Sequence, residues 1–486
     1  MNNVSKTAVA IALAALTVVT LWFIAVANFG GPLEKFGMGI LDIFVIGLLL
    51  QVSLKPKGGY GLYLVGTKRG IKTVDNISKR HAKFWDAMAM WGLTVGLGLI
   101  SYPLVKGRID RRVYAFGMAS LVLMYIFLVP YLSSAYYLIN IPQLQNAIAS
   151  QAGAPQPTQI SALAIAEICI TLVFGFTGLL ISTMFVNAGV ILVGLAQYLG
   201  SVAAGAANSS SISNQVPGVA PVIPGIDIPL ITGLVSLVII LVIHEFSHGI
   251  LARSFRIKLK SIGVLLFGTL PIGAFVEPDE KAVNKLDSLK QTKIYSAGVS
   301  ANFIAAIAFF FLSLLVAYTL APSAYKDILV ITTVAQGYPA SGVLQPGMQI
   351  LSWNGHNITN VTALNAVAAA DVPGQAVTVA TSTGTFTLTA VQQPGNPSHG
   401  IIGIDAGYKR IITTAYGSVV NFFSELFLLS MLLNFLVAVL NLLPLPIFDG
   451  WRIYKANVKN KMIVKVATAL VILGFVLNAV PWIFYR

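Results

Sequence analysis

The chain of 486 residues has 56% hydrophobic and only 10% charged residues, and apolar runs of about twenty residues recur along it, as bilayer-spanning helices require. Its single cysteine, Cys169, excludes an intrachain disulfide and cysteine-rich zinc modules. The net charge of +14 would raise the question of nucleic acid in a soluble protein, but here the basic residues cluster in short loops between apolar runs. We therefore expect a polytopic α-helical membrane protein that contacts the lipid bilayer and binds no nucleic acid.

The apolar runs predict nine or ten membrane spans. The first run is too long for the core of a signal peptide, so we interpret it as a retained anchor. The fifth run is long enough for two spans. The predicted spans lie near 8–28, 37–53, 84–105, 113–135, 161–199, 229–252, 294–319, 418–443 and 463–484.

Charge in the connecting segments predicts the orientation of the spans. Basic clusters mark cytoplasmic loops, and these are 55–83, 253–260 and 452–461. Two segments with almost no charge, 132–160 and 200–226, should face outside. The basic residues at 106–112 also indicate the cytoplasm, so the 84–105 segment is either re-entrant or not a span, and the sequence leaves this open.

Between two late spans the composition changes completely. The region 326–410 contains alternating stretches such as AVTVATSTGTFTLTA and turn signals at WNG and QPG. These features predict a small β-rich soluble domain inserted between membrane spans. By the predicted orientation, this domain lies outside the cytoplasm.

The apolar stretch ILVIHEFSHGIL, at 240–251, contains ionisable residues that are expensive in lipid. On a helix, His244 and His248 point the same way one turn apart, so both imidazoles can coordinate one zinc ion. Glu245, beside the first of them, can hold a water molecule and take its proton. A proton-relay or transporter role is the competing functional interpretation of this stretch.

A hydrolytic zinc site needs a third protein ligand. The acids in other predicted spans are Asp42, Glu167, Glu425 and Asp449. Asp449 stands out, because it follows two prolines in NLLPLPIFDGW, at 441–451, and approaches the same face of the bilayer as the histidines by the predicted orientation. We interpret the other three acids as hydrogen-bond partners in helix packing or as residues near an interface.

These residues carry a family resemblance. The motifs HEFSH, SAGVSANF and NLLPLPIFDG, with a β-rich insert between the last two, are similar to those of the site-2 protease family of intramembrane zinc metalloproteases, over about 220–486. The resemblance implies one zinc ion per chain, held by His244, His248 and Asp449, with Glu245 as the general base. It implies further that Asn302 and Asn441 help to bind the substrate backbone. Gly298 falls on the glycine of the middle motif, for which close helix packing is the plainer explanation.

The insert is similar to a PDZ domain in the segment GYPASGVLQPGMQILSWNGHNI, at 337–358. Such domains bind extended peptides by adding a strand to a sheet edge, and the family resemblance implies that the insert screens substrates or senses a cleaved peptide end. A merely structural domain is the alternative. Three departures from the family patterns, FDGW, AGVSAN and PGMQ, remove neither a ligand nor the base.

The sequence thus predicts four parts: an N-terminal transmembrane region (1–220), core spans with the first two motifs (221–325), the PDZ-like domain (326–410), and a core span with the last motif followed by a final span (411–486). We expect a multi-pass protein of the plasma membrane, with its active site near the cytoplasmic face. Its predicted partners are transmembrane protein substrates, with extended peptide ends at the PDZ-like domain.

The predicted activity is zinc-dependent hydrolysis of peptide bonds within transmembrane segments, for regulated intramembrane proteolysis or for clearance of membrane remnants. The segment 262–280 is too broken by glycine and proline for a helix, and we expect short strands that offer an edge to an unwound substrate. A hairpin that only rests on the membrane interface is the alternative. Competing functions are a catalytically inactive scaffold, an ion-coupled transporter, and a zinc protease of the prenyl-protein-processing type that would use a glutamate such as Glu425 as third ligand.

Overall fold

The computed structural model describes residues 3–26, 32–54, 57–59, 61–68, 70–139, 162–205, 212, 215, 217–219, 222, 224–225, 227–268, 270–393 and 396–484. The chain forms two compact units. The first combines Met1–Ile141, Ile160–Phe311 and Leu426–Arg486, and the second contains Leu312–Glu425. The predicted N-terminal region and the motif-bearing spans therefore belong to one structural unit. Much of the weakly charged segments 132–160 and 200–226 lies outside the described residues.

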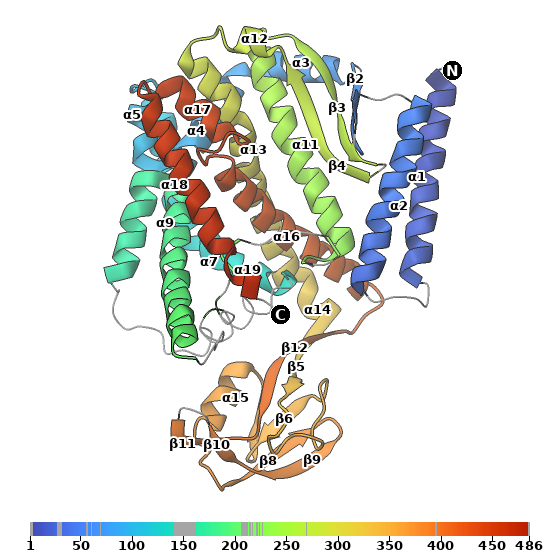
Figure 1. Cartoon of the computed structure of the whole chain (residues 1–486), viewed down its shortest axis with the longest axis vertical. Helices are drawn as coiled ribbons and strands as arrows, with labels where there is room; N and C mark the ends of the chain where they lie inside the picture. The colour runs from blue at the N-terminus through green and yellow to red at the C-terminus, as the bar shows by residue number, and fades with distance from the viewer. Residues whose placement is uncertain are drawn as a thin grey trace. The chain divides into compact units, whose positions relative to one another are not determined.

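Long helices dominate the first unit (Figure 1). They are α1 (Asn3–Val26), α2 (Pro32–Leu54), α3 (Ile71–Arg80), α4 (Ala82–Leu97), α6 (Arg111–Leu123), α9 (Ala162–Ala203), α11 (Leu230–Ser254), α13 (Ser288–Leu315), α16 (Gly417–Leu440), α17 (Asp449–Asn457) and α18 (Lys461–Ala479). Shorter helical pieces of this unit are η1 (Gly98–Ile100), α5 (Ser101–Leu104), η2 (Met124–Leu128), α7 (Val129–Leu132), η3 (Ser133–Leu138), α12 (Glu280–Val283) and α19 (Pro481–Phe484). The pieces η4 (Val316–Leu320) and α14 (Ala321–Ala324), with the start of α16, belong to the second unit.

Seven helical segments in the described part of the chain are long and apolar enough to cross a membrane. They are Ala82–Leu104, Arg111–Leu132, Ala164–Ala203, Leu230–Ser254, Ser288–Ala324, Gly417–Leu440 and Lys461–Phe484, and two shorter apolar helices occupy Ala15–Ile24 and Gly37–Ser53. The chain is therefore a polytopic helical membrane protein. The predicted count of nine or ten spans is not confirmed.

Two glycines interrupt helices where the helices touch. Gly175 breaks α9 with φ 64° and ψ −164°, and Gly98 ends α4 with φ 60° and ψ −142°. A Cβ on Gly175 would collide with the carbonyl of Gly96, and one on Gly98 would collide with the carbonyl of Leu172. Only glycine allows both this conformation and this backbone approach. The run at 161–199, predicted to be long enough for two spans, thus contains two helices that meet at Gly175, and together they form one of the candidate membrane segments.

The ends of the 84–105 segment meet the same end of α13. Asp86 pairs with Lys293 at 2.7 Å, and Arg108 contacts Ser288 at 2.9 Å. A straight helix from residue 86 to residue 108 would be about 33 Å long, whereas the two partners lie only about 8 Å apart along α13. The chain therefore doubles back after Gly98, which is the arrangement expected of the re-entrant alternative.

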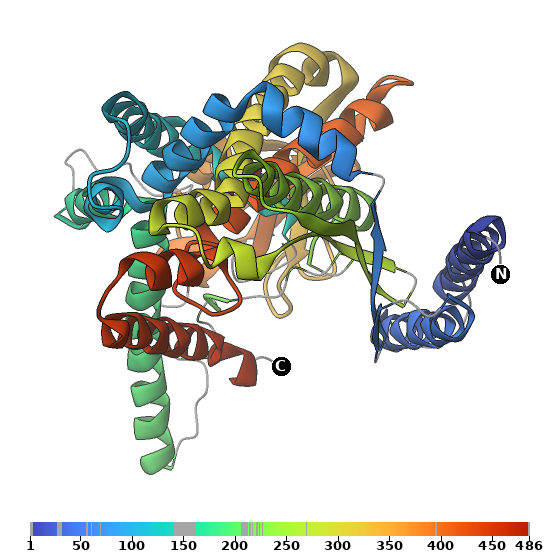
Figure 2. The same cartoon turned by 90° about the horizontal axis from the view of Figure 1, so that it is seen from above.

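A four-stranded antiparallel sheet lies against α11 and has the order β1-β2-β3-β4. The strands are β1 (Lys57–Gly59), β2 (Leu62–Thr67), β3 (Leu259–Phe267) and β4 (Leu270–Pro278), so the strands expected within 262–280 form the hairpin β3–β4. β2 pairs with β3 over its whole length, and Figure 2 shows blue β2 beside the green hairpin. Two strands that the sequence did not reveal thus come from the N-terminal region.

The N-terminal region also contacts the core helices directly. Asp75 on α3 forms a two-pronged ion pair with Arg253 at the end of α11, with one of the two hydrogen bonds at 2.9 Å. Ser300 on α13 donates to the carbonyl of Ala89 at 3.2 Å, and a Cβ on Gly92 would meet Ser300 at 2.5 Å. Small residues allow this close approach of α4 and α13.

The second unit contains the predicted β-rich domain. Its strands are β5 (Tyr325–Val334), β6 (Ile350–Trp353), β7 (His356–Asn357), β8 (Ala376–Thr381), β9 (Gly384–Thr389), β10 (Val391–Gln393), β11 (Asn396–Ile401) and β12 (Ile404–Ile412), with helix α15 (Val361–Ala368). The sheets have the orders β7-β6-β8-β9, β12-β5 and β10-β11. The predicted WNG turn is present, because Asn354 and Gly355 both have positive φ between β6 and β7. Identity with a PDZ domain is not established by this arrangement.

Candidate active site

Helix α11 places the two histidines of the HEFSH motif on one face. His244 and His248 are one turn apart, and their Nε2 atoms are 3.1 Å from each other. Both side chains are largely buried, with 9% and 12% of their surface exposed. Two imidazoles are therefore held together in a helix that is long and apolar enough to span a membrane.

Asp449 reaches the histidines because the backbone before it is not helical. Helix α16 ends at Leu440, and α17 begins at Asp449 itself. In the intervening segment the backbone is paired locally, and Gly450 N–H donates to the carbonyl of Asn441 at 2.6 Å. A Cβ on Gly450 would collide with the carbonyl of Leu442, so the glycine of the FDGW motif lets α17 begin against the unwound chain.

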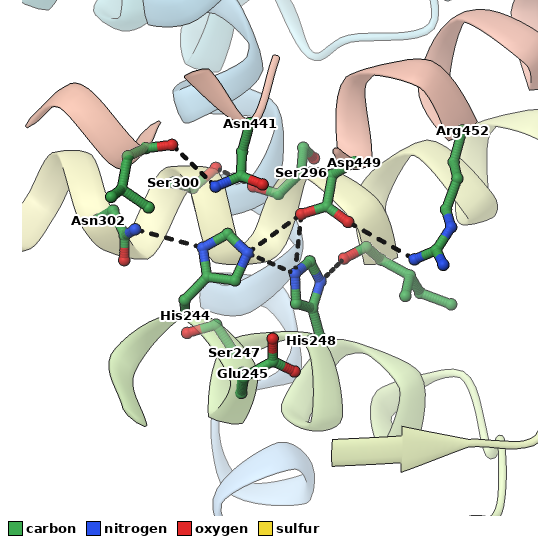
Figure 3. Close-up of polar contacts among 12 residues, drawn as sticks. His244, Glu245, Ser247, His248, Ser296, Ser300, Asn302, Asn441, Asp449 and Arg452 are labelled. Carbon is green, nitrogen blue, oxygen red and sulfur yellow. Dashed lines mark hydrogen bonds and ion pairs between the residues drawn. The ribbon is translucent and has the colours of Figure 1, made fainter. Parts of the chain in front are cut away.

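The three side chains direct their ligand atoms at one another (Figure 3). Asp449 Oδ2 lies 3.2 Å from His244 Nε2 and 3.0 Å from His248 Nε2. Ligand atoms about 2.0–2.1 Å from a tetrahedral zinc ion are about 3.3 Å apart, which is close to these separations. In the described residues, these three form the group of His, Cys, Asp or Glu side chains that could hold a metal ion.

The hydrogen bond of His248 sets the tautomer that a metal needs. Its Nδ1 lies 2.7 Å from the carbonyl of Ile294, which can only accept, so Nδ1 carries the proton. A metal then binds through Nε2, which faces Asp449 and His244, and takes the place of any proton there. A carbonyl partner of this kind is the usual support of a metal-binding histidine.

Asn302 lies behind His244. Its side chain is fully buried, and its Nδ2 is 3.3 Å from His244 Nδ1, while its Oδ1 is a buried atom without a described partner. If His244 binds a metal through Nε2, its Nδ1 must carry the proton, and the amide must turn its oxygen toward the ring. The unpartnered Oδ1 of Asn302 thus fits a zinc ion bound to His244. The three candidate ligands, two imidazoles and a carboxylate, fit it as well.

Gly298 on α13 provides the space for the two rings. A Cβ at this position would lie 2.6 Å from His244 Cε1 and 2.6 Å from His248 Nε2. Real Cβ contacts of this length are not tolerated, so any other residue displaces a candidate ligand. Gly298 therefore allows close packing, as expected, and the groups that pack against it are the imidazole rings of His244 and His248.

Glu245 projects from α11 beside the cluster and accepts a hydrogen bond of 3.4 Å from the backbone N–H of Val276 on β4. A cavity of about 620 Å³ opens at this point. Its lining comes from the three candidate ligands, Glu245, strand β4, Asn441 and the start of α17, with Leu64 from the N-terminal sheet. The cavity therefore gives the cluster and the acid a common space for a substrate.

Charge and burial act in opposite directions on Asp449. Burial would raise the pKa of this carboxyl, but the imidazoles of His248 and His244 outweigh it and hold the pKa below its ordinary value. Asp449 is therefore an anion, which is the form that binds a cation. Burial also raises the pKa of the neighbouring Tyr454, whose hydroxyl donates to the carbonyl of Leu442 at 2.9 Å.

The other predicted residues take separate positions. Asn441 lines the cavity and donates to the carbonyl of Val437 at 2.9 Å. Asp42 on α2 accepts from Thr20 on α1 at 2.7 Å, as expected of a helix-packing partner. Glu425 accepts from Asn421 at 2.7 Å within α16 itself, so this bond packs no second helix. Neither acid, nor Glu167, belongs to the candidate metal group. A third ligand of the Glu425 type is therefore not supported.

Sequence reasoning missed Arg452, which lies three residues after Asp449 and lines the same cavity. A helix predicted after Asp449 would have indicated it, because residues three apart lie side by side on a helix surface.

Comparison with known proteins assigns the chain to a family. Residues 232–480 match peptidase family M50, the site-2 protease family, and the chain belongs to this family of membrane metallopeptidases. An uncharacterized protein of Methanocaldococcus jannaschii is 31% identical over 249 residues, which are 50% of this chain and 63% of that protein. A protein of Arabidopsis thaliana named as a membrane-bound transcription factor site-2 protease homolog is 32% identical over 124 residues, 25% of this chain and 24% of that protein. The chain thus matches less than two thirds of the length of either relative.

We predict that Gly298→Ala abolishes or strongly weakens zinc binding, because the new methyl group overlaps both imidazoles. Zinc per chain in the purified protein measures this. Gly249→Ala is the matched control, since its Cβ would meet the side chain of Val276 at 2.9 Å and neither ring. Full zinc content in Gly298→Ala would show that the histidines are not the ligands.

Proposed function

We propose that this protein is an intramembrane zinc endopeptidase that hydrolyses peptide bonds within transmembrane segments of membrane proteins. The observation that carries the proposal is the convergence of His244, His248 and Asp449 beside Glu245 in one cavity of a polytopic membrane chain. Membership of peptidase family M50 supports it. An inactive scaffold would need neither a complete ligand set nor the acid.

Zinc, one per chain, would polarise the scissile carbonyl and make water a better nucleophile at neutral pH. Glu245 holds the attacking water and takes its proton as the water oxygen bonds to the carbonyl carbon. The same carboxyl then gives the proton to the leaving nitrogen as the carbon–nitrogen bond breaks. The products are one chain ending in a carboxylate and one beginning with an amine.

The substrate helix must unwind before its carbonyl can be attacked, and an unwound strand needs partners for its backbone groups. Among the described strands, β3 pairs with one side of β4 and no strand pairs with the other, which leaves a free edge. The N–H of Val276 points away from β3, since it donates to Glu245, and the N–H of Ala274, two residues earlier, points the same way. We propose that the unwound substrate adds to this edge.

Asn441 is placed to contact the substrate backbone, since it lies in the cavity wall. Asn302, which the sequence also suggested for this role, is buried behind His244, and its position supports an orienting contact with that ligand. Direct contact of Asn302 with substrate stays a prediction.

Orientation and biological role are proposed from the basic residues after α11 and from the plant relative. His248 lies five residues before Arg253, near the basic end of α11, so we propose an active site near the cytoplasmic face of the plasma membrane. The β-rich domain is then extracytoplasmic and would screen substrates or bind cleaved peptide ends as a PDZ-like domain. The plant relative is named as a membrane-bound transcription factor site-2 protease homolog, which favours release of a regulatory domain, and clearance of membrane remnants is the other candidate role.

The central test of this activity is Glu245→Gln. Wild type and variant are incubated in detergent micelles with a pool of purified single-span membrane proteins, and the products are identified by mass spectrometry. We expect cuts inside transmembrane segments with wild type only, while both proteins bind one zinc. Equal cleavage by the variant would remove Glu245 from the mechanism, and zinc-replete wild type that cuts nothing would favour a scaffold or a transporter.

The free edge of β4 is tested by Ala274→Pro, which deletes one outward N–H and spares the pairing with β3. We expect cleavage of the same substrates to fall at least about tenfold, with zinc content unchanged. Ala274→Val keeps the N–H and is the control. Proline substitutions within 264–267 would not test this edge, because these residues fall on β3, which is paired on both sides. Unchanged cleavage by Ala274→Pro would show that substrate does not add to β4.

A further inference from the structure

Hydrolysis of an amide concentrates negative charge on the carbonyl oxygen of the scissile bond. Hydrogen-bond donors fixed beside that oxygen are among the largest contributions to such reactions. Glu245 cannot contribute, because a carboxylate carries the same sign of charge. Besides the zinc ion and the backbone N–H groups of β4, a further donor can come from another side chain in the cavity wall.

Among the described residues of the cavity wall other than the candidate ligands, four side chains carry N–H or O–H donors: Lys260, Tyr295, Asn441 and Arg452. The amine of Lys260 pairs with Glu277 at 3.8 Å, and the amide of Asn441 already donates to Val437. The guanidinium of Arg452 lies over the ring of Tyr295, 5.5 Å from its centre. Of the two cationic side chains in this wall, Lys260 pairs with Glu277 and Arg452 pairs with the candidate ligand Asp449.

Its position is fixed by the helix that carries Asp449. Arg452 follows one turn later on α17, and its Nη1 lies 3.9 Å from Asp449 Oδ1, the oxygen that does not face the histidines. Figure 3 shows the guanidinium turned toward the cluster from α17, whereas Glu245 approaches from α11. The side chain is 49% exposed, so its remaining N–H groups are accessible to a molecule in the cavity.

We propose that Arg452 is a catalytic residue that donates a hydrogen bond to the scissile carbonyl oxygen as negative charge develops there. The inference rests on the proposed peptidase function and assigns the charge-stabilising role within it. Arginine suits this role because its guanidinium stays protonated and presents several donors in a rigid plane. The general base Glu245 and the hydrogen-bond donor Arg452 thus come from different helices, α11 and α17, on either side of the bond to be cut.

The test compares Arg452→Met and Arg452→Lys with wild type. Lys455→Met is the matched control, because Lys455 lies one turn further along α17, with its amine over the ring of Trp451 at 4.6 Å, and does not line the cavity. The readouts are zinc per chain, kcat and KM on a substrate that wild type cleaves, and the affinity of a phosphinic peptide that imitates the tetrahedral state.

We expect Arg452→Met to keep one zinc and a KM within a few-fold of wild type, while kcat falls about 100-fold or more. Affinity for the phosphinic peptide should fall by a similar factor, and Arg452→Lys should recover part of both losses. Wild-type kcat in Arg452→Met, or loss of zinc from it, would overturn the inference while leaving the peptidase function intact. A zinc-replete wild type that cleaves nothing would overturn the proposed function and the inference with it.

Discussion

Asp449 meets the two histidines only because the chain stops being helical between Leu440 and Asp449. If α16 continued as a helix, Asp449 would lie about 13 Å beyond Leu440 along the helix axis. The unwound segment is possible at this position because its backbone groups pair locally and Leu442 and Leu443 are buried against protein. Gly450 then allows α17 to begin against that segment. The cluster of candidate metal ligands, the cavity wall and the position of Arg452 all depend on this non-helical segment between α16 and α17.

The same unit shows why the first hundred residues matter to the site. Strands β1 and β2 extend the hairpin whose free edge faces Glu245, so Leu64 lines the same cavity as the candidate ligands. The ion pair between Asp75 and Arg253 ties α3 to α11 only five residues after His248. Paired groups of this kind are costly to separate once they leave water, so the N-terminal region restrains the helix that carries the histidines.

The sequence predicted the chemistry of the site better than the path of the chain. His244, His248 and Asp449 could be found because ionisable residues are rare in apolar runs and their spacing limits what they can do. The breaks at Gly98 and Gly175 could not, because a glycine in an apolar run resembles ordinary helix packing until its backbone neighbour is known. The pairing of β2 with β3 was also hidden, since the two strands are about two hundred residues apart. Local patterns carry no information about such contacts.

The central claim is that motifs distant in sequence form one metal site. It is tested most directly by zinc per chain in purified wild type, Asp449→Ala and Asp42→Ala, where Asp42 is a control aspartate on α2 that accepts a hydrogen bond from Thr20 and lies outside the candidate metal group. We predict about one zinc in wild type and in Asp42→Ala, and sharply less in Asp449→Ala. A folded wild type without zinc, or zinc binding indifferent to Asp449, would contradict the account.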